Sequence, residues 1–211
     1  MKGLCLIISG GEFCRLPEDV PKADFVIACD RGWQHAQRLG ISPDLIVGDF
    51  DSSPLPDTDI PLERAPTRKD DTDTMLAVRR ALEAGYRELV ICCAFGGRMD
   101  HTMANLQTAA YIAAHGGQAR VIGADTEALT LTGGRMRIPC REGWSLSVFS
   151  LTDRCAGVEI QGTKYTCENA ELTNTFPLGV SNVWAAAEAE IAVQEGILLI
   201  IQSKLRPGEH I

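Results

Sequence analysis

Residues 44–53, with the sequence DLIVGDFDSS, contain the pattern that decides the fold of this chain. Three consecutive apolar residues at positions 45–47 are typical of a strand that is buried on both faces of a sheet. Gly48 follows them, and two aspartates, Asp49 and Asp51, then stand two positions apart. Because parallel sheets bind ligands just outside the carboxyl ends of their strands, the stretch predicts a buried parallel strand that ends at a ligand site.

Short apolar runs of the same kind recur through the first 125 residues. The further runs predicted to be strands are residues 4–9, 25–29, 88–95 and 119–123. Residues 72–85 and 100–117 have the amphipathic spacing of helices, and both segments end at glycines. This alternation predicts an α/β N-terminal domain, residues 1–125, with a parallel, Rossmann-like sheet.

The pattern changes in the rest of the chain. Short, often alternating segments are separated there by Gly, Pro and Asn, and no helix of normal length fits among them. The segments predicted to be strands are residues 128–134, 135–140, 144–151, 157–162, 189–196 and 197–203. They predict a C-terminal all-β sandwich domain, residues 126–211.

Charge and composition restrict the classes of partner. The chain has 211 residues, a formal net charge of −8 and no long run of Lys or Arg. This charge argues against nucleic acid or an anionic membrane as the main partner. Anionic small ligands stay compatible with it, because a bound divalent metal inverts the local field.

The cysteines and the N-terminus predict a cytoplasmic protein. Three of the eight cysteines, Cys5, Cys29 and Cys92, lie inside predicted buried strands, and no Cys or His pair has zinc spacing. We therefore expect reduced, structural cysteines. The N-terminal residues have no signal-peptide cleavage pattern, and the longest later apolar run, residues 197–201, is too short to span a bilayer.

Acidic residues gather where a parallel sheet binds its ligand. The sequences CDRGWQH, GDFDSS and FGGRMDH follow predicted strands, and TRKDDTDT precedes a predicted helix. Together they contain Asp30, Asp49, Asp51, Asp70, Asp71, Asp73 and Asp100. Mg²⁺ in proteins prefers carboxylate and phosphate oxygens, so these clusters predict a site for a metal and a polyphosphate.

Each cluster also has a simpler interpretation. In an extended chain Asp49 and Asp51 point to the same side, yet Asp51 could equally cap a turn with the serines after it. Thr72 or Asp71 could serve as a helix N-cap, although a cap does not require the preceding Lys69. Arg98 suits phosphate oxygens. His101, in contrast, is more typical of a surface residue.

Familiar nucleotide motifs are absent. The chain contains no GxxxxGK[ST] loop, no GxGxxG and no GxSxG. P-loop kinases, nicotinamide-dependent enzymes and α/β-hydrolases therefore lose support.

Four ordered motifs resemble the thiamine pyrophosphokinase (thiamine diphosphokinase) family. They are PDLIVGDFDSS, KDDTDTMLAV, GGRMDHTMANL and, in the predicted β domain, GVSN followed by AEIAVQEGILLII. The resemblance implies transfer of a pyrophosphoryl group from ATP to the hydroxyl of thiamine, with Mg²⁺ as cofactor. It also implies a homodimer with thiamine near the subunit interface. The segment CDRGWQH departs from the glycine-rich motif usual in the family, but it keeps Asp30 and Gly32.

The resemblance assigns site residues by motif. The metal ligands would be Asp49, Asp51 and Asp73, and the catalytic residues would be these three and Asp100. The ATP and phosphate site would contain Asp30, Gly32, Lys69, Thr72, Gly97 and Arg98, and the thiamine site would contain Lys69, Ser181 and Asn182. The residue that accepts the hydroxyl proton stays open between Asp73 and Asp100.

Two alternative functions keep the same clusters. One is a related diphosphokinase that acts on another primary alcohol, such as a hydroxymethylpterin. The other is a non-catalytic protein that binds thiamine or a nucleotide and releases no AMP.

Overall fold

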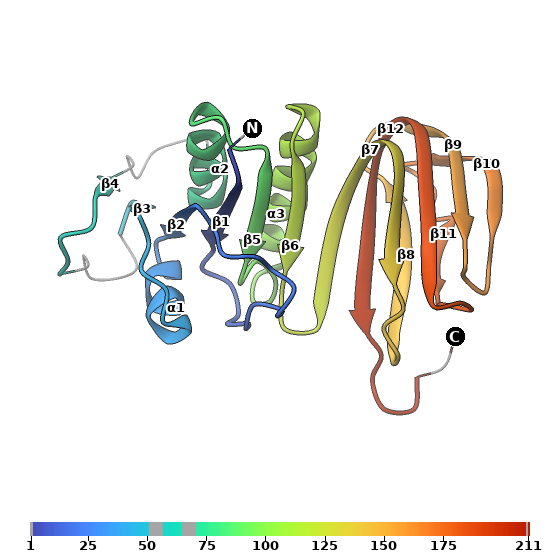
Figure 1. The fold of residues 1–211 in the computed structure, drawn as a ribbon, viewed down its shortest axis with the longest axis horizontal. Helices are drawn as coiled ribbons and strands as arrows, with labels where there is room; N and C mark the ends of the chain where they lie inside the picture. The colour runs from blue at the N-terminus through green and yellow to red at the C-terminus, as the bar shows by residue number, and fades with distance from the viewer. Residues whose placement is uncertain (1, 51–56, 65–70, 210) are drawn as a thin grey trace. The chain divides into compact units, whose positions relative to one another are not determined.

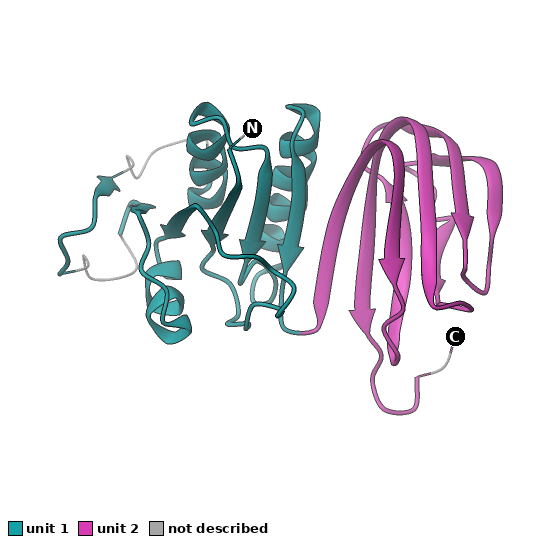
Figure 2. Ribbon diagram, viewed as in Figure 1, with its two compact units in different colours: residues 1–124 teal, residues 125–211 magenta. Residues whose placement is uncertain are grey.

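The computed structural model describes residues 2–50, 57–64, 71–209 and 211. The chain divides into two compact units, residues 1–124 and residues 125–211 (Figure 2). Among the described residues, no helix has both the length and the apolar character needed to cross a membrane. Three residues of the predicted acidic and phosphate clusters, Asp51, Lys69 and Asp70, lie outside the described residues.

The first unit is built on a set of parallel strands (Figure 1). Its strands are β1 (Leu4–Ile8), β2 (Phe25–Cys29), β3 (Leu45–Gly48), β4 (Leu62–Arg64), β5 (Glu88–Cys92) and β6 (Gln118–Ile122). They pair in the order β6-β5-β1-β2-β3-β4, and every pairing is parallel. β1 is buried along its whole length, as expected for a strand with helices on both faces.

The helices described in this unit are α1 (Gly32–Leu39), α2 (Asp73–Glu83) and α3 (Met99–Ala114). The sequence predicts α2 and α3 but not α1. α1 has only eight residues, and no described side chain caps its start, so the usual start signal is missing. It ends at Gly40, which has a φ of 68° in the left-handed region that glycine favours.

Among the described residues, apolar clusters in the core of the first unit include the following two. The larger contains buried residues of β1, β2, β5 and β6, together with Cys14, Ala36 and Cys93. The smaller contains Ala28, Ile46 and Phe50, with Trp33 and Ile60 packed against them. The smaller cluster lies next to the ends of β2 and β3, so the polar strand ends rest on an apolar base.

The second unit is made of antiparallel strands. They are β7 (Thr126–Pro139), β8 (Trp144–Ser150), β9 (Arg154–Gln161), β10 (Cys167–Thr173), β11 (Gly179–Asn182) and β12 (Glu188–Lys204). β12 pairs with β7 along most of its length, with β9 in its first half and with β8 in its second half. β10 extends the pairing beyond β9, and β11 extends it beyond β8. The strands thus form two groups around β12, one with β8 and β11 and the other with β9 and β10. Buried apolar side chains of β7, β8, β9, β10 and β12 form one core.

Two predicted strand breaks in this unit are wrong. Residues 128–134 and 135–140 form the single strand β7, and residues 189–196 and 197–203 form the single strand β12. The register between β7 and β12 shifts between Val193 and Ile197, and Gly196 there has a φ of 93°. A glycine at such a shift can bend a strand without ending it. In the sequence, a glycine at a bulge cannot be distinguished from a glycine in a turn.

All eight cysteines lie in the described part of the chain, and all are free thiols. Cys5, Cys29 and Cys92 are buried in strands, as the sequence predicts, while Cys140 is exposed. The stability of each unit therefore comes from its core and its hydrogen bonds rather than from disulfides.

Candidate active site at the strand ends of the first unit

The ends of β2 and β3 lie against each other. The Asp30 amide donates a hydrogen bond to the Val47 carbonyl over 2.8 Å. A Cβ atom placed on Gly48 would lie 3.3 Å from the Cα and Cβ atoms of Asp30, so the glycine permits this close approach. Asp30 and Asp49 therefore come from adjoining backbone at the carboxyl edge of the strands, although they are distant in the sequence.

The backbone at Phe50 is not extended. Phe50 has a φ of 55° and Asp30 a φ of 43°, both in the left-handed region. Phe50 is only 9% exposed, so its side chain turns into the protein. The extended chain expected from Asp49 to Asp51, which would turn both carboxylates to one side, is therefore wrong at Phe50. Left-handed non-glycine residues are uncommon and often mark ligand sites.

Gly32 has a packing reason to be glycine. A Cβ atom there would lie 1.9 Å from the Ile8 carbonyl oxygen. The start of α1 therefore approaches the end of β1 more closely than any side chain allows. This contact explains the glycine without a nucleotide.

The start of α2 brings Thr72 and Asp73 to the same edge. The Thr72 hydroxyl accepts a hydrogen bond from the Met75 amide over 3.1 Å, which makes Thr72 the N-cap. Asp73 is the first residue of the helix. Asp71, in contrast, pairs with Arg79 at 2.8 Å on the surface. The capping interpretation thus holds for Thr72, and Asp73 is the described acid of this cluster at the helix start.

The loop between β5 and α3 ends at Arg98, and Asp100 follows in the first turn of α3. Gly97 has a φ of 71°, and Arg98 stands just before the helix. The guanidinium of Arg98 donates to the carboxylate of Asp100, with Nε at 3.1 Å from Oδ1, and both side chains are largely exposed. The hydrogen bond from Arg98 lowers the pKa of Asp100, and the same bond raises the pKa of Arg98. Both groups are therefore charged at neutral pH.

Buried hydrogen bonds hold the start of this loop, at residues 93 and 94, in place. The Asn105 amide nitrogen donates to the Ala94 carbonyl over 2.6 Å. The Cys93 amide donates to the Cys14 sulfur over 3.2 Å, and Cys93 itself has a φ of 55°. The loop geometry thus comes from buried bonds as well as from its glycines.

The segment after β1 also belongs to this edge, although it was not among the residues predicted from the sequence. The Gly11 amide donates to the Cys93 carbonyl over 2.8 Å, and the Glu12 amide donates to the Phe95 carbonyl over 2.9 Å. Residues 9–12, SGGE, therefore run beside the loop that leads to Arg98. Their signal in the sequence is a glycine pair directly after a buried strand, the same signal as in FGGRMDH.

In the second unit, Ser181 and Asn182 have different environments. Ser181 is exposed, has a φ of 59°, and uses its backbone amide to donate to the Ser147 hydroxyl. Asn182 is 7% exposed. Its side-chain oxygen accepts from the Tyr165 and Val183 amides, and its side-chain nitrogen donates to the Thr163 hydroxyl and the Tyr165 carbonyl. The amide of Asn182 is thus fully hydrogen-bonded within the protein.

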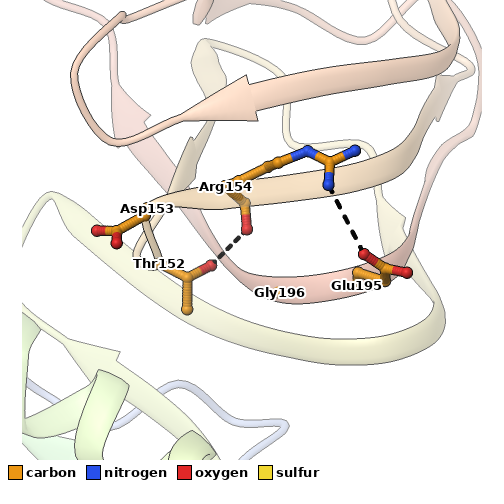
Figure 3. Close-up of a pocket in the computed structure, with 5 residues that line it drawn as sticks. All are labelled: Thr152, Asp153, Arg154, Glu195 and Gly196. Atoms are coloured by element: carbon orange, nitrogen blue, oxygen red, sulfur yellow. Dashed lines mark hydrogen bonds and ion pairs between the residues drawn. The ribbon is translucent and has the colours of Figure 1, made fainter.

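The hollow drawn in Figure 3 contains none of the predicted site residues. It lies in the second unit and is lined by Thr152, Asp153, Arg154, Glu195 and Gly196 (Figure 3). The guanidinium of Arg154 already pairs with Glu171 at 2.5 Å and with Glu195 at 4.0 Å. Both carboxylates would compete with any anion for this guanidinium.

The chemistry of the donors at the strand ends suits a hard cation. Carboxylates from Asp30, Asp49 and Asp73 come from neighbouring elements at one edge, and carboxylate oxygen is the ligand that Mg²⁺ prefers. Within the described residues, no three Asp, Glu, His or Cys side chains already converge tightly enough to hold an ion by themselves.

Comparison with known protein families gives two matches in chain order. Residues 17–121 match the model of the thiamin pyrophosphokinase catalytic domain, and residues 135–198 match the model of the thiamin pyrophosphokinase vitamin B1 binding domain. No curated protein sequence matched the chain.

Solved structures share the fold over almost the whole chain. Thiamine pyrophosphokinase from Bacillus subtilis is 24% identical with a TM-score of 0.83, covering 96% of this chain and 99% of the other. A thiamin pyrophosphokinase family protein from Enterococcus faecalis is 27% identical with a TM-score of 0.76, covering 96% and 99%. Thiamin pyrophosphokinase from Candida albicans is 15% identical with a TM-score of 0.73, covering 96% and 90%.

Proposed function

The chain belongs to the thiamin pyrophosphokinase family, and from this premise we infer that it transfers a pyrophosphoryl group from ATP to the hydroxyl of thiamine. The products are thiamine diphosphate and AMP. The observation that carries this function is the ordered match of a catalytic part and a vitamin B1 binding part along one chain. The adjoining strand ends that carry Asp30 and Asp49 in the catalytic part support the same chemistry.

Asp49, Asp51 and Asp73 are the proposed ligands of Mg²⁺, and Asp30 adjoins the backbone before Asp49 through the Gly48 contact. When bound, Mg²⁺ neutralises charge on the polyphosphate oxygens. Asp49 follows a strand that is buried in the core, and Asp73 opens a capped helix. Both carboxylates therefore stand on rigid supports before any ligand binds.

Phosphate contacts are proposed for Lys69, Thr72, Arg98 and the Gly97 loop. Arg98 is exposed and its planar guanidinium has five N–H donors. Asp100 uses part of this donor set, and the remaining N–H groups can bind phosphate oxygens. Gly32 allows the start of α1 to approach the end of β1 closely, and this contact fixes the backbone next to the proposed ATP site.

The alcohol must lose a proton as it attacks the β-phosphorus. Asp73 and Asp100 are the two candidates for the proton acceptor. The ion pair with Arg98 lowers the pKa of Asp100, so this carboxylate is ionised but is a weaker base. Alignment of the hydroxyl with phosphorus is the larger contribution that the protein makes to such reactions.

The proposed thiamine site includes Ser181, Asn182 and Lys69. The hydroxyl of Ser181 is exposed on β11, whereas the bonded amide of Asn182 holds the wall of the site in place. The large apolar side chains of Phe176, Leu178 and Val180, shortly before Ser181 in the sequence, are also exposed, as is that of Tyr165, whose amide donates to Asn182. These exposed apolar side chains support the proposal of a homodimer with thiamine bound near the interface.

We assign the first unit to the Rossmann-like class and the second to the β-sandwich class, with the catalytic role in the first and thiamine binding and dimerisation in the second. The parallel order of β1–β6 and the single core shared by both strand groups of the second unit support this assignment. The free cysteines support a cytoplasmic location.

The function is tested by offering ATP and Mg²⁺ with either thiamine or a hydroxymethylpterin, and then quantifying AMP and the phosphorylated product. We expect AMP and thiamine diphosphate in equal amounts with thiamine and neither product with the pterin. Product formation with the pterin alone would replace thiamine by another alcohol. Nucleotide binding without AMP from either acceptor would make the chain a non-catalytic binding protein.

A further inference from the structure

A buried pair of hydroxyl groups links the central strand of the first unit to the helix that carries Asp73. The Ser9 Oγ and the Thr74 Oγ1 lie 2.8 Å apart, although the two residues are 65 positions apart in the sequence. Ser9 is 5% exposed and Thr74 is 6% exposed. Neither hydroxyl is therefore placed to contact substrate directly.

Packing alone does not require this pair. Alanine and valine would fill nearly the same volume, and burying a hydroxyl costs free energy that its hydrogen bond only offsets. A hydroxyl pair differs from an apolar pair in one respect, since it fixes distance and direction. The pair therefore specifies how the first turn of α2 is oriented against β1.

The two ends of the link are at the carboxyl edge of the strands. Ser9 follows directly after β1, and its amide donates to the Cys92 carbonyl of β5 over 2.9 Å. Thr74 is the second residue of α2, next to Asp73 and two positions after the cap Thr72. The bond thus joins the helix start to the two central strands.

We propose that Ser9 and Thr74 are positioning residues, whose buried hydrogen bond holds Asp73 in the orientation needed for the metal–polyphosphate site. This proposal rests on the function proposed above, and in particular on the metal-binding role of Asp73. Small displacements of such a group are costly, because a shift of about 1 Å in a reacting constellation can lower the rate about 100-fold.

The test compares Thr74→Val and Ser9→Ala, singly and together, with two control variants. Thr108→Val removes a buried hydroxyl bond within α3, to the Ala104 carbonyl, and Ser145→Ala removes one to the Ser203 carbonyl in the second unit. We expect Thr74→Val to lower kcat/KM about 10- to 100-fold and to raise the Mg²⁺ concentration for half-maximal activity several-fold. The controls should leave both quantities within about 2-fold of wild type, and Thr74→Ser should restore most of the activity.

The double variant gives an independent check. If the hydroxyls act as one unit, Ser9→Ala combined with Thr74→Val is no slower than the worse single variant. Multiplicative effects of the two changes, or wild-type kinetics in Thr74→Val, overturn the proposal.

Failure of the proposed function is distinguishable from failure of this inference. The calorimetric affinity for ATP in the presence of Mg²⁺ needs no acceptor, and we expect it to fall at least about 5-fold in Thr74→Val but not in Thr108→Val. A wild-type protein that makes no thiamine diphosphate refutes the proposed function, while the affinity comparison still decides the role of the hydroxyl pair. Equal loss of melting temperature and unchanged affinity in both threonine variants would show a merely structural role and overturn the proposal.

Discussion

Replacing Asn182 by alanine is expected to act mainly by lowering the free energy of unfolding of the second unit. Asn182 is buried, and its side chain makes four hydrogen bonds, two as acceptor and two as donor. Three of them connect β11 to Thr163 and Tyr165, and in the fourth the side-chain oxygen accepts from the neighbouring Val183 amide. Alanine removes all four at once and supplies no replacement.

The size of the effect follows from those bonds. A typical intramolecular hydrogen bond contributes about 1 kcal/mol net, and a buried group left without a partner costs about 1–3 kcal/mol. Because Tyr165 is largely exposed, water can satisfy its backbone groups, so we expect a loss of about 3 kcal/mol rather than more. For a chain of this size, that loss lowers the melting temperature by about 6–12 °C.

The assay combines thermal unfolding, followed by circular dichroism, with the KM for thiamine measured well below the melting temperature. Ser181→Ala is the matched neighbour, because its side chain is exposed and its backbone amide keeps the bond to Ser147. It should melt within about 2 °C of wild type and raise the KM for thiamine about 3- to 10-fold, the effect of losing one hydrogen bond. An Asn182→Ala protein that melts like wild type would refute the structural role of Asn182.

Three further predictions concern the first unit. Arg98→Ala should raise the KM for ATP about 10-fold, as expected for the loss of one charge-assisted contact. The melting temperature should stay within about 2 °C of wild type, because the Arg98–Asp100 pair is exposed. A KM equal to that of wild type would show that Arg98 does not bind phosphate. Asp49→Asn should lower kcat about 100-fold at saturating Mg²⁺ through weaker stabilisation of the transition state. Asp153→Asn, at an exposed residue of the second unit that has no proposed catalytic role, should retain the wild-type kcat. Comparable rates in the two variants would contradict a metal-binding role of Asp49. Burial and then the charge of Asp44 raise the pKa of Cys5 from 9.0 to about 12, so its contribution to stability is complete below pH 9 and is lost as the pH rises toward 12. Urea unfolding between about pH 9 and 11 should show that Cys5→Ala reduces the alkaline loss of stability by about 1.4 kcal/mol per pH unit, and an unchanged slope would mean that Cys5 does not titrate as described.

Much of the first unit could be predicted because each of its main strands is a continuous apolar run. β1, β2 and β3 have no polar interruption, β5 has none after its first residue, and the acidic clusters directly follow β2 and β3. α1 and β4 could not be predicted, because α1 is short and uncapped and β4 is a three-residue strand of exposed and half-buried residues. Tertiary contacts decide such short elements, and local sequence carries little of that information.

The position of Asp30 and Asp49 at strand ends could be predicted from the sequence, but the contacts that hold the candidate site in place could not. Strand-end aspartates were evident from Asp30 and Asp49, whereas residue type left the helix cap open between Thr72 and Asp71, and the structure places it at Thr72. The left-handed backbone of Phe50, the close approach at Gly48 and the Ser9–Thr74 bond join residues through space or through unusual dihedral angles. None of these features has a periodic pattern in the sequence, so only the structure places them.

The most direct test of the central claim follows the β-phosphorus of ATP. The protein is incubated with thiamine, Mg²⁺ and ATP labelled at the β-phosphate, and the products are separated. Pyrophosphoryl transfer predicts that the β label appears in thiamine diphosphate and that the AMP is unlabelled. Label recovered in ADP, with thiamine carrying one phosphate or none, would contradict the account.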